Sequence, residues 1–159
     1  MTTVTITVTA SQTITIPSHV KMINVTCKGA GGGGHSGMYE PPYQGLGGSE
    51  GATENGSSIS VIPGGQYAIV IGTKGIGGRY NQWAAPTPGG ATSAFGVSAG
   101  GGAAGGVDYT ATKGGGTSGG AAGTQYGNYN GGNAGGYGCG GGGGYSDRST
   151  MGTGGDGSD

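Results

Sequence analysis

The stretch GAAGGVDYTATKGGGTSGGAAGTQYGNYNGGNAGGYGCGGGGG, residues 102–144, places glycine preferentially at every third position. In the phase that runs from Gly102 to Gly144, ten of fifteen sites are glycine, against about a third of the sites in each other phase. A three-residue repeat is the turn of the polyproline II family of extended helices, where glycine is required wherever neighbouring backbones crowd together. The stretch therefore predicts rods packed backbone to backbone, with large side chains displayed in the loops between them.

The composition suits an ordered chain with an unusual interior. Glycine fills 46 of 159 positions, and Leu46, Phe95 and Trp83 are the only residues of their types. Disordered chains usually stay soluble through charge, whereas charged residues make up only 8% here. Because ordering each residue costs about 1–2 kcal/mol and large apolar side chains are scarce, we expect stabilisation from packed peptide planes and from hydrogen bonds between rods.

The charge and hydropathy patterns exclude several partner classes. The net charge is −1 and the cationic residues are scattered, so we expect no nucleic-acid partner, which would need a basic stripe. No run of about 18 apolar residues is present, so we expect no membrane insertion. Residues 1–6 alternate without the apolar core of a signal peptide, so a protein working outside a cell would arrive on an assembled particle.

Period-two alternation predicts strands in the N-terminal half. The expected strands are residues 3–9, 13–16, 22–27, 58–62 and 66–72, with shorter runs at 93–95 and 97–98. Pro63-Gly64-Gly65 predicts that the strands on either side of it form a hairpin. Nothing shows a 3.6-residue period, and glycine at this density costs about 1 kcal/mol per site in a helix, so we expect no α-helix.

The expected fold class is all-β plus irregular: an N-terminal antiparallel β-sheet or sandwich joined to a glycine-rich bundle of polyglycine II helices. We place N-terminal strands for docking at residues 1–28. We place the bundle at residues 29–159, with a β-hairpin at 58–72 and Tyr-rich loops. The glycine runs expected to form rods begin at Gly29, Gly45, Gly100, Gly114, Gly131 and Gly152.

The loops between the glycine runs hold the large side chains. Seven of the nine tyrosines lie there, while Tyr67 falls in a predicted strand and Tyr137 within a glycine run. Tyr, Trp, Ser, Gly and Asn make up recognition surfaces because aromatic rings offer contact area at low entropy cost. The alternative is that the tyrosines cap the bundle ends and shield the backbone. The candidate receptor-binding residues, in order, are Tyr126, Tyr129, Tyr80, Trp83, Tyr109, Tyr39 and Tyr43.

No catalytic constellation stands out. Neither His19 nor His35 lies in a recognisable nucleophile motif, and nothing selects a pair among the few carboxylates. We therefore expect no enzyme activity, no catalytic residue, no cofactor and no metal. Cys27 and Cys139 lack metal-binding spacing, and they are either two buried small hydrophobic residues or a disulfide pair.

Three blocks resemble the glycine-rich domain of phage tail-fibre and related virion proteins. The first runs from Thr13-Ile14-Thr15-Ile16-Pro17 through Met22–Cys27 into Gly29–Gly34, the second is Val61–Gly72, and the third is Gly89–Gly102. The resemblance implies a β-sheet part joined to a polyglycine II bundle. In the similar tip adhesins of T-even-like long tail fibres, such bundles hold variable loops against the bacterial surface.

The function expected from these patterns is that of a phage virion surface protein: a tail-fibre or tail-tip adhesin that recognises a host receptor through aromatic loops. Expected partners are other virion structural proteins, through the N-terminal strands, and a host surface glycan or outer-membrane protein, with assembly as a homo-oligomer. The alternative is a non-enzymatic structural protein, either a capsid decoration or a fibre subunit. Ice binding is a third possibility, which the bulky loops disfavour and a thermal-hysteresis assay would test.

Overall fold

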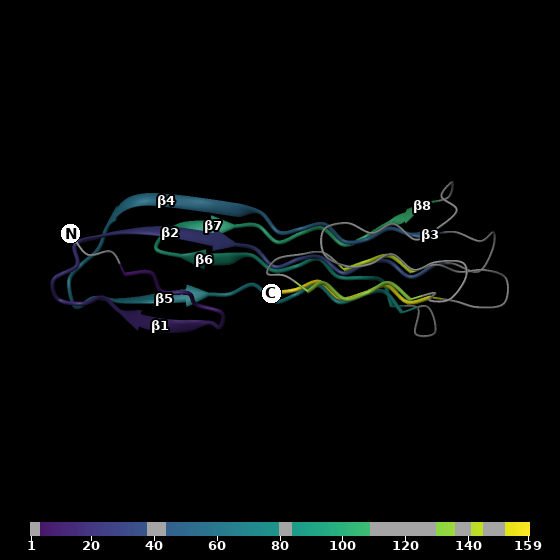
Figure 1. The fold of residues 1–159 in the computed structure, drawn as a ribbon, viewed down its shortest axis with the longest axis horizontal. Helices are drawn as coiled ribbons and strands as arrows, with labels where there is room; N and C mark the ends of the chain where they lie inside the picture. The colour runs from purple at the N-terminus through teal and green to yellow at the C-terminus, as the bar shows by residue number, and fades with distance from the viewer. Residues whose placement is uncertain (1–3, 38–43, 80–83, 109–129, 136–140, 145–151) are drawn as a thin grey trace.

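In the computed structural model the molecule is elongated, with strands at one end and long extended segments at the other (Figure 1). The structure describes residues 4–37, 44–79, 84–108, 130–135, 141–144 and 152–159. Within these ranges there are strands and irregular segments but no helix, which confirms the expected all-β plus irregular class.

Antiparallel strands form the end of the molecule that carries the N-terminus. Four of them form one sheet in the order β1-β5-β6-β7, and β2 pairs with β4 in a second sheet. A short third ladder, β3 with β8, lies at the opposite end of the molecule (Figure 1). The strands are β1 (Gln12–Thr15), β2 (Met22–Lys28), β3 (Gln44–Gly45), β4 (Thr53–Ser60), β5 (Gln66–Val70), β6 (Thr92–Ala94), β7 (Val97–Ala99) and β8 (Val107–Asp108).

A small apolar core lies between the two larger sheets. Its buried members are Cys27 of β2, Ile69 of β5, Ala94 of β6 and Ala99 of β7. Partly buried residues pack around it: Val8, Ile14, Val25, Ile71, Phe95 and Val97. Such a core is too small to hold 159 residues by apolar burial alone, so most of the stabilisation must come from the rest of the chain.

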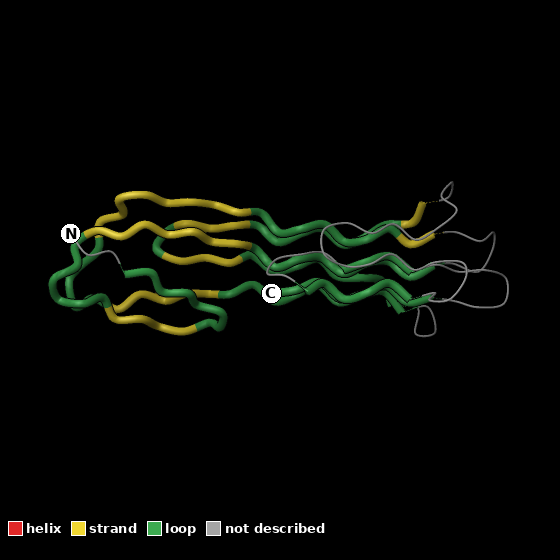
Figure 2. Tube along the Cα trace, viewed as in Figure 1, coloured by secondary structure: helices red, strands yellow, loops and turns green. Residues whose placement is uncertain are grey.

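The extended segments continue the strands and run side by side (Figure 2). We call each of them a rod. Residues 29–37 follow β2 and form the central rod, in which every residue except His35 is buried. Around it lie six ring rods, three antiparallel to it (45–52, 84–91 and 152–159) and three parallel to it (72–79, 100–106 and 141–144).

Hydrogen bonds join the central rod to all six neighbours. The amides of Gly32, Gly33 and Gly34 donate in turn to carbonyls of the three antiparallel ring rods, and this rotation repeats every third residue. Carbonyls of the central rod accept amides of the three parallel rods with the same period. Each ring rod also bonds to the ring rods on either side, as Gly90 N does to Thr73 O at 2.8 Å. The expected backbone-to-backbone packing of three-residue rods is confirmed for the described residues.

An eighth rod, residues 130–135, extends this arrangement beyond the ring. Its Gly131 amide donates to Thr153 O at 2.8 Å, and Gly142 donates to Gly132 O at 3.0 Å. It therefore contacts two ring rods, 141–144 and 152–159, and lies outside them.

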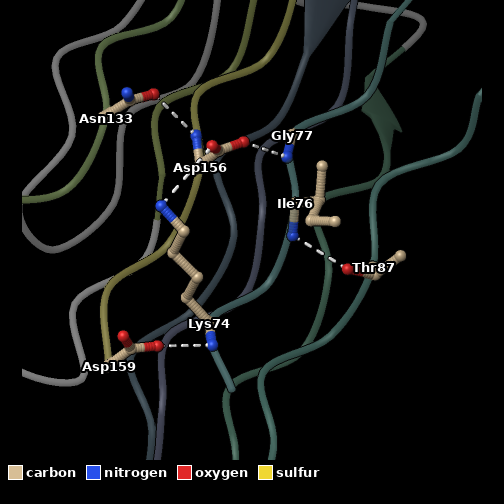
Figure 3. A network of polar contacts seen from close by, with 7 residues as sticks. All are labelled: Lys74, Ile76, Gly77, Thr87, Asn133, Asp156 and Asp159. Atoms are coloured by element: carbon tan, nitrogen blue, oxygen red, sulfur yellow. Dashed lines mark hydrogen bonds and ion pairs between the residues drawn. The ribbon is translucent and has the colours of Figure 1, made fainter.

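Several backbone amides donate to a side-chain oxygen in place of a backbone carbonyl. Asp156 accepts a hydrogen bond from the Gly77 amide at 2.8 Å, and its other oxygen lies 3.8 Å from Lys74 Nζ (Figure 3). Asp159 accepts the Lys74 amide at 2.7 Å. Oxygen atoms of Ser11, Asn24, Ser49, Thr87, Thr92, Asn130 and Asn133 accept backbone amides in the same way. Most of these bonds are exposed, but the Gly77 amide is half-buried and the Gly72 amide, which Thr92 accepts, is buried, so these two depend on their side-chain partners.

The hairpin predicted at residues 58–72 is wrong, although its turn exists. Gly65 donates to Ile62 O at 2.9 Å, which closes the turn, but β4 then pairs with β2 while β5 pairs with β1 and β6. The buried residue Ile16 explains the separation, because it exchanges two backbone hydrogen bonds with Gly64 and Gly65 and so aligns β5 with β1. The true hairpin joins β6 to β7 through Phe95 and Gly96, whose φ values of 52° and 82° are those of a two-residue I′ turn.

Two further expectations about the N-terminal segment need correction. Residues 4–9 form no strand, because no hydrogen bond joins them to another described part of the chain. The strands β1 and β2, placed before residue 28 as a separate unit, pair with β5 and β4 from beyond it. The strands expected at 13–16, 22–27 and 66–72 are confirmed as β1, β2 and β5 within two residues at each end.

Cys27 is expected to make stability depend on alkaline pH. Its thiol is free and buried, and burial raises its pKa above the usual 9.0. The thiol has its raised pKa only in the folded state. Its contribution to the free energy of unfolding is therefore fully present below the pKa of the unfolded thiol, and it is lost as pH rises through the pKa of the folded thiol. We expect the stability difference between the native chain and Cys27→Ala, measured by urea unfolding, to be constant up to about pH 8 and to shrink above pH 9. A difference that stays constant through pH 11 would contradict this, and Cys139→Ser in both proteins removes the second thiol as a complication.

Candidate functional site

The end of the bundle opposite the strands, which we call the distal end, is where four segments leave the rods and return to them. Each is bounded by described residues. Gly37 and Gln44 border residues 38–43, Arg79 and Ala84 border 80–83, Asp108 and Asn130 border 109–129, and Gly144 and Gly152 border 145–151. The distal end is therefore the candidate functional site.

Backbone hydrogen bonds join the borders of these segments to one another. Arg79 and Ala84 exchange two bonds of 2.9 and 3.1 Å, which close the base of residues 80–83. Gln44 and Asp108 are partners in the ladder of β3 and β8, so the border at which residues 38–43 end lies beside the border at which residues 109–129 begin (Figure 1).

The fourth segment begins and ends beside the first. Gly37 donates to Gly152 O at 3.1 Å, and Gly45 donates to Gly144 O at 3.0 Å. The borders of segments far apart in the chain are therefore held together at a single end by backbone hydrogen bonds. This placement suits a recognition surface built from several loops.

All seven predicted receptor-binding residues belong to these segments and lie outside the described residues. Tyr39 and Tyr43 fall in 38–43, Tyr80 and Trp83 in 80–83, and the other three, Tyr109, Tyr126 and Tyr129, in 109–129. The structure thus brings the borders of their three segments to one end of the molecule. It does not test their role in binding.

Some polar side chains of the described ranges make contacts within the fold. Lys28 Nζ lies 2.6 Å from Glu50, which joins the base of the central rod to a ring rod. His35 Nδ1 lies 2.6 Å from its neighbour's carbonyl, Ser36 O. Nowhere in the described ranges do three or more His, Cys, Asp or Glu side chains gather as metal ligands would. No helix that could cross a membrane occurs in the same ranges.

The family model of the glycine-rich domain matches residues 5–159. The chain belongs to the glycine-rich domain family. In this glycine-rich domain the match covers the strand end and the bundle alike, so the family corresponds to the whole architecture and not to the glycine runs alone. A search of curated proteins gave no match.

Sequence reasoning missed the side chains that complete the glycine-rich domain's hydrogen bonding. Asn130 and Asn133 accept the amides of Thr153 and Asp156, each at 2.9 Å, and so attach the eighth rod to the last ring rod. Their spacing of three residues was the available signal, because it repeats the rod period and places both side chains on one side.

Proposed function

We propose that this glycine-rich domain is a phage virion surface protein, a tail-fibre or tail-tip adhesin that recognises a host-cell receptor through aromatic side chains at the distal end. All seven candidate residues belong to residues 38–43, 80–83 and 109–129. The borders of these three segments converge at the distal end, and this observation supports the proposal. Aromatic rings presented together on a rigid base lose little entropy on binding.

The bundle supplies the rigidity that such a site needs. The central rod is hydrogen-bonded to six others, so the borders of the segments are fixed relative to one another. The receptor class that fits is a host surface glycan or an exposed part of an outer-membrane protein, since both offer faces on which aromatic rings stack. The opposite end, which carries the strands, is left for attachment to the virion.

The test is the double variant Tyr126→Ala/Tyr129→Ala, measured as the rate of particle adsorption to host cells. We expect adsorption to fall at least about thirtyfold, since two aromatic anchors at a binding centre together contribute about 2 kcal/mol or more. The thermal unfolding midpoint is measured alongside, so that lost contacts are distinguished from lost folding, and the proposal expects adsorption to fall with the midpoint unchanged.

Tyr67→Phe is the matched control. Tyr67 belongs to β5 at the strand end, where its hydroxyl accepts the Ile62 amide at 2.9 Å, so its loss should lower stability slightly and leave adsorption intact. Unaltered adsorption of the double variant would overturn the proposed recognition site. If the protein then maps to the head shell of the particle, the structural alternative, a capsid decoration, would take its place.

A further inference from the structure

Residues 4–10 lie outside every strand and have no hydrogen-bond partner among the described residues. No backbone or side-chain hydrogen bond joins them to another described residue. Val4 and Ile6 are 78% and 73% exposed, the largest exposures among the large apolar side chains of the described residues. Only Val8, at the inner end, packs against the core.

The composition of this segment is that of a strand. β-Branched Thr, Val and Ile alternate from Thr3 to Thr9, and such residues favour a pleated, half-buried surface. A run with open amides and carbonyls and exposed apolar side chains lacks the partner strand that its sequence predicts. No described part of this chain supplies that strand, whereas a second chain can.

The sequence itself selects the partner. Thr3-Val4-Thr5-Ile6-Thr7-Val8-Thr9 reads the same in both directions. If two copies pair antiparallel about a two-fold axis at Ile6, Ile6 faces its own copy, Val4 faces Val8 and Thr5 faces Thr7. Apolar β-branched residues then oppose one another on one face and threonines on the other, which are favourable cross-strand pairs.

We propose that residues 4–8 pair with the same residues of a second copy of this chain, forming a symmetric dimer joined at the strand end. Because Val8 already packs against the core, the joined apolar face continues from the core of each copy. A two-fold contact of this kind closes on itself, so it yields a dimer and not an open-ended filament. The two distal ends are free in this dimer, so it does not depend on the proposed receptor site.

The test is sedimentation equilibrium of the full chain and of Ile6→Lys over a wide range of concentrations. The native chain should form a dimer, and Ile6→Lys should raise its dissociation constant at least about a hundredfold, since the axis would place two lysines opposite each other in place of two isoleucines. Ile62→Lys is the matched control, because Ile62 is 71% exposed and lies outside the segment, and its dimer should persist.

A charge-swap mixture tests the two-fold register directly. Ile6→Lys and Ile6→Glu should each be monomeric alone and should form a one-to-one dimer when mixed, because residue 6 faces residue 6. A native chain that stays monomeric at every concentration would overturn the proposal. So would a dimer that Ile6→Lys leaves intact. If the native chain is monomeric and Ile6→Lys nevertheless abolishes assembly onto particles, the segment pairs with a different virion protein and the second copy is excluded.

Discussion

Replacing Gly33 with alanine is expected to cost at least about 3 kcal/mol of folding free energy, the upper range for overpacking an interior. Gly33 lies in the middle of the central rod, and a Cβ there would overlap the carbonyl group of Ile76 in a parallel ring rod. The obstacle is backbone that is itself hydrogen-bonded to its neighbours, so it cannot move aside as the end of a side chain could. The rods around the site would have to separate.

The cost of an added side chain in the central rod depends on its position and not on its size. Ala30 and Ser36, three residues before and after Gly33, carry side chains in the same phase and are still buried. Between them, Gly33 faces the middle of its neighbour, where no space is left. Similar overlaps with ring-rod carbonyls occur at Gly29, Gly32 and Gly34.

Gly106→Ala is the matched control for Gly33→Ala. An added Cβ at Gly106 meets nothing within 4 Å, and the residue is exposed. There the loss of chain entropy in the unfolded state should raise stability by about 0.5–1 kcal/mol. Thermal or urea unfolding of both variants measures their stabilities. The thermal midpoint of Gly33→Ala should lie about 6–12 °C below that of the native chain. Equal midpoints would show that backbone packing does not hold the bundle together.

The glycine period predicted the rods but not their arrangement. In the phase that runs through Gly102 and Gly105, an added Cβ would overlap ring-rod backbone, as expected. At Gly135, in the same phase, it would meet nothing within 4 Å, because the eighth rod lies outside the ring. Period three shows that a segment can be a rod. Its place in the bundle depends on which rods surround it, which a single repeat does not encode.

Rods poor in glycine escaped prediction for a related reason. Residues 84–91 read Ala-Ala-Pro-Thr-Pro-Gly-Gly-Ala, and yet they form a ring rod. An outer rod needs bare backbone only on the side that faces its neighbours, and proline fits the extended φ of such helices. The central rod has neighbours on every side, so its run of glycines at Gly31–Gly34 gave the clearer signal.

Strand pairing was predicted less well than strand position. Alternation located β1, β2 and β5, but the Pro-Gly-Gly turn suggested a hairpin where the chain crosses between sheets. Local turn chemistry is compatible with both outcomes, and the bonds from Ile16 decide between them. For the candidate site, sequence placed the aromatic residues in loops between rods. It could not show that three of those loops start from one end, since that follows from the directions of the rods.

Thr92 supplies a buried hydrogen-bond acceptor where the bundle joins the strands, and its removal should lower stability. Its Oγ1 accepts the Gly72 amide at 3.0 Å, at the point where a ring rod leaves β5, and both residues are buried. Thr92→Val keeps the shape of the side chain and removes the acceptor, so the Gly72 amide is left buried without a partner. An unsatisfied buried donor costs about 1–3 kcal/mol, and we expect a loss of that size in urea unfolding.

Thr87→Val separates this effect from the loss of a hydroxyl in general. Thr87 Oγ1 accepts the Ile76 amide at 2.8 Å in the same geometry, but this bond is exposed, so water can replace the lost acceptor (Figure 3). Its cost should stay below about 1 kcal/mol, the net value of an ordinary hydrogen bond. If the two variants lose equal stability, the buried hydrogen bond of Thr92 contributes no more to the free energy of unfolding than the exposed bond of Thr87. If Thr92→Val loses clearly more, the buried Gly72 amide needs its side-chain partner, whereas the exposed amide of Ile76 can bond to water when its partner is removed.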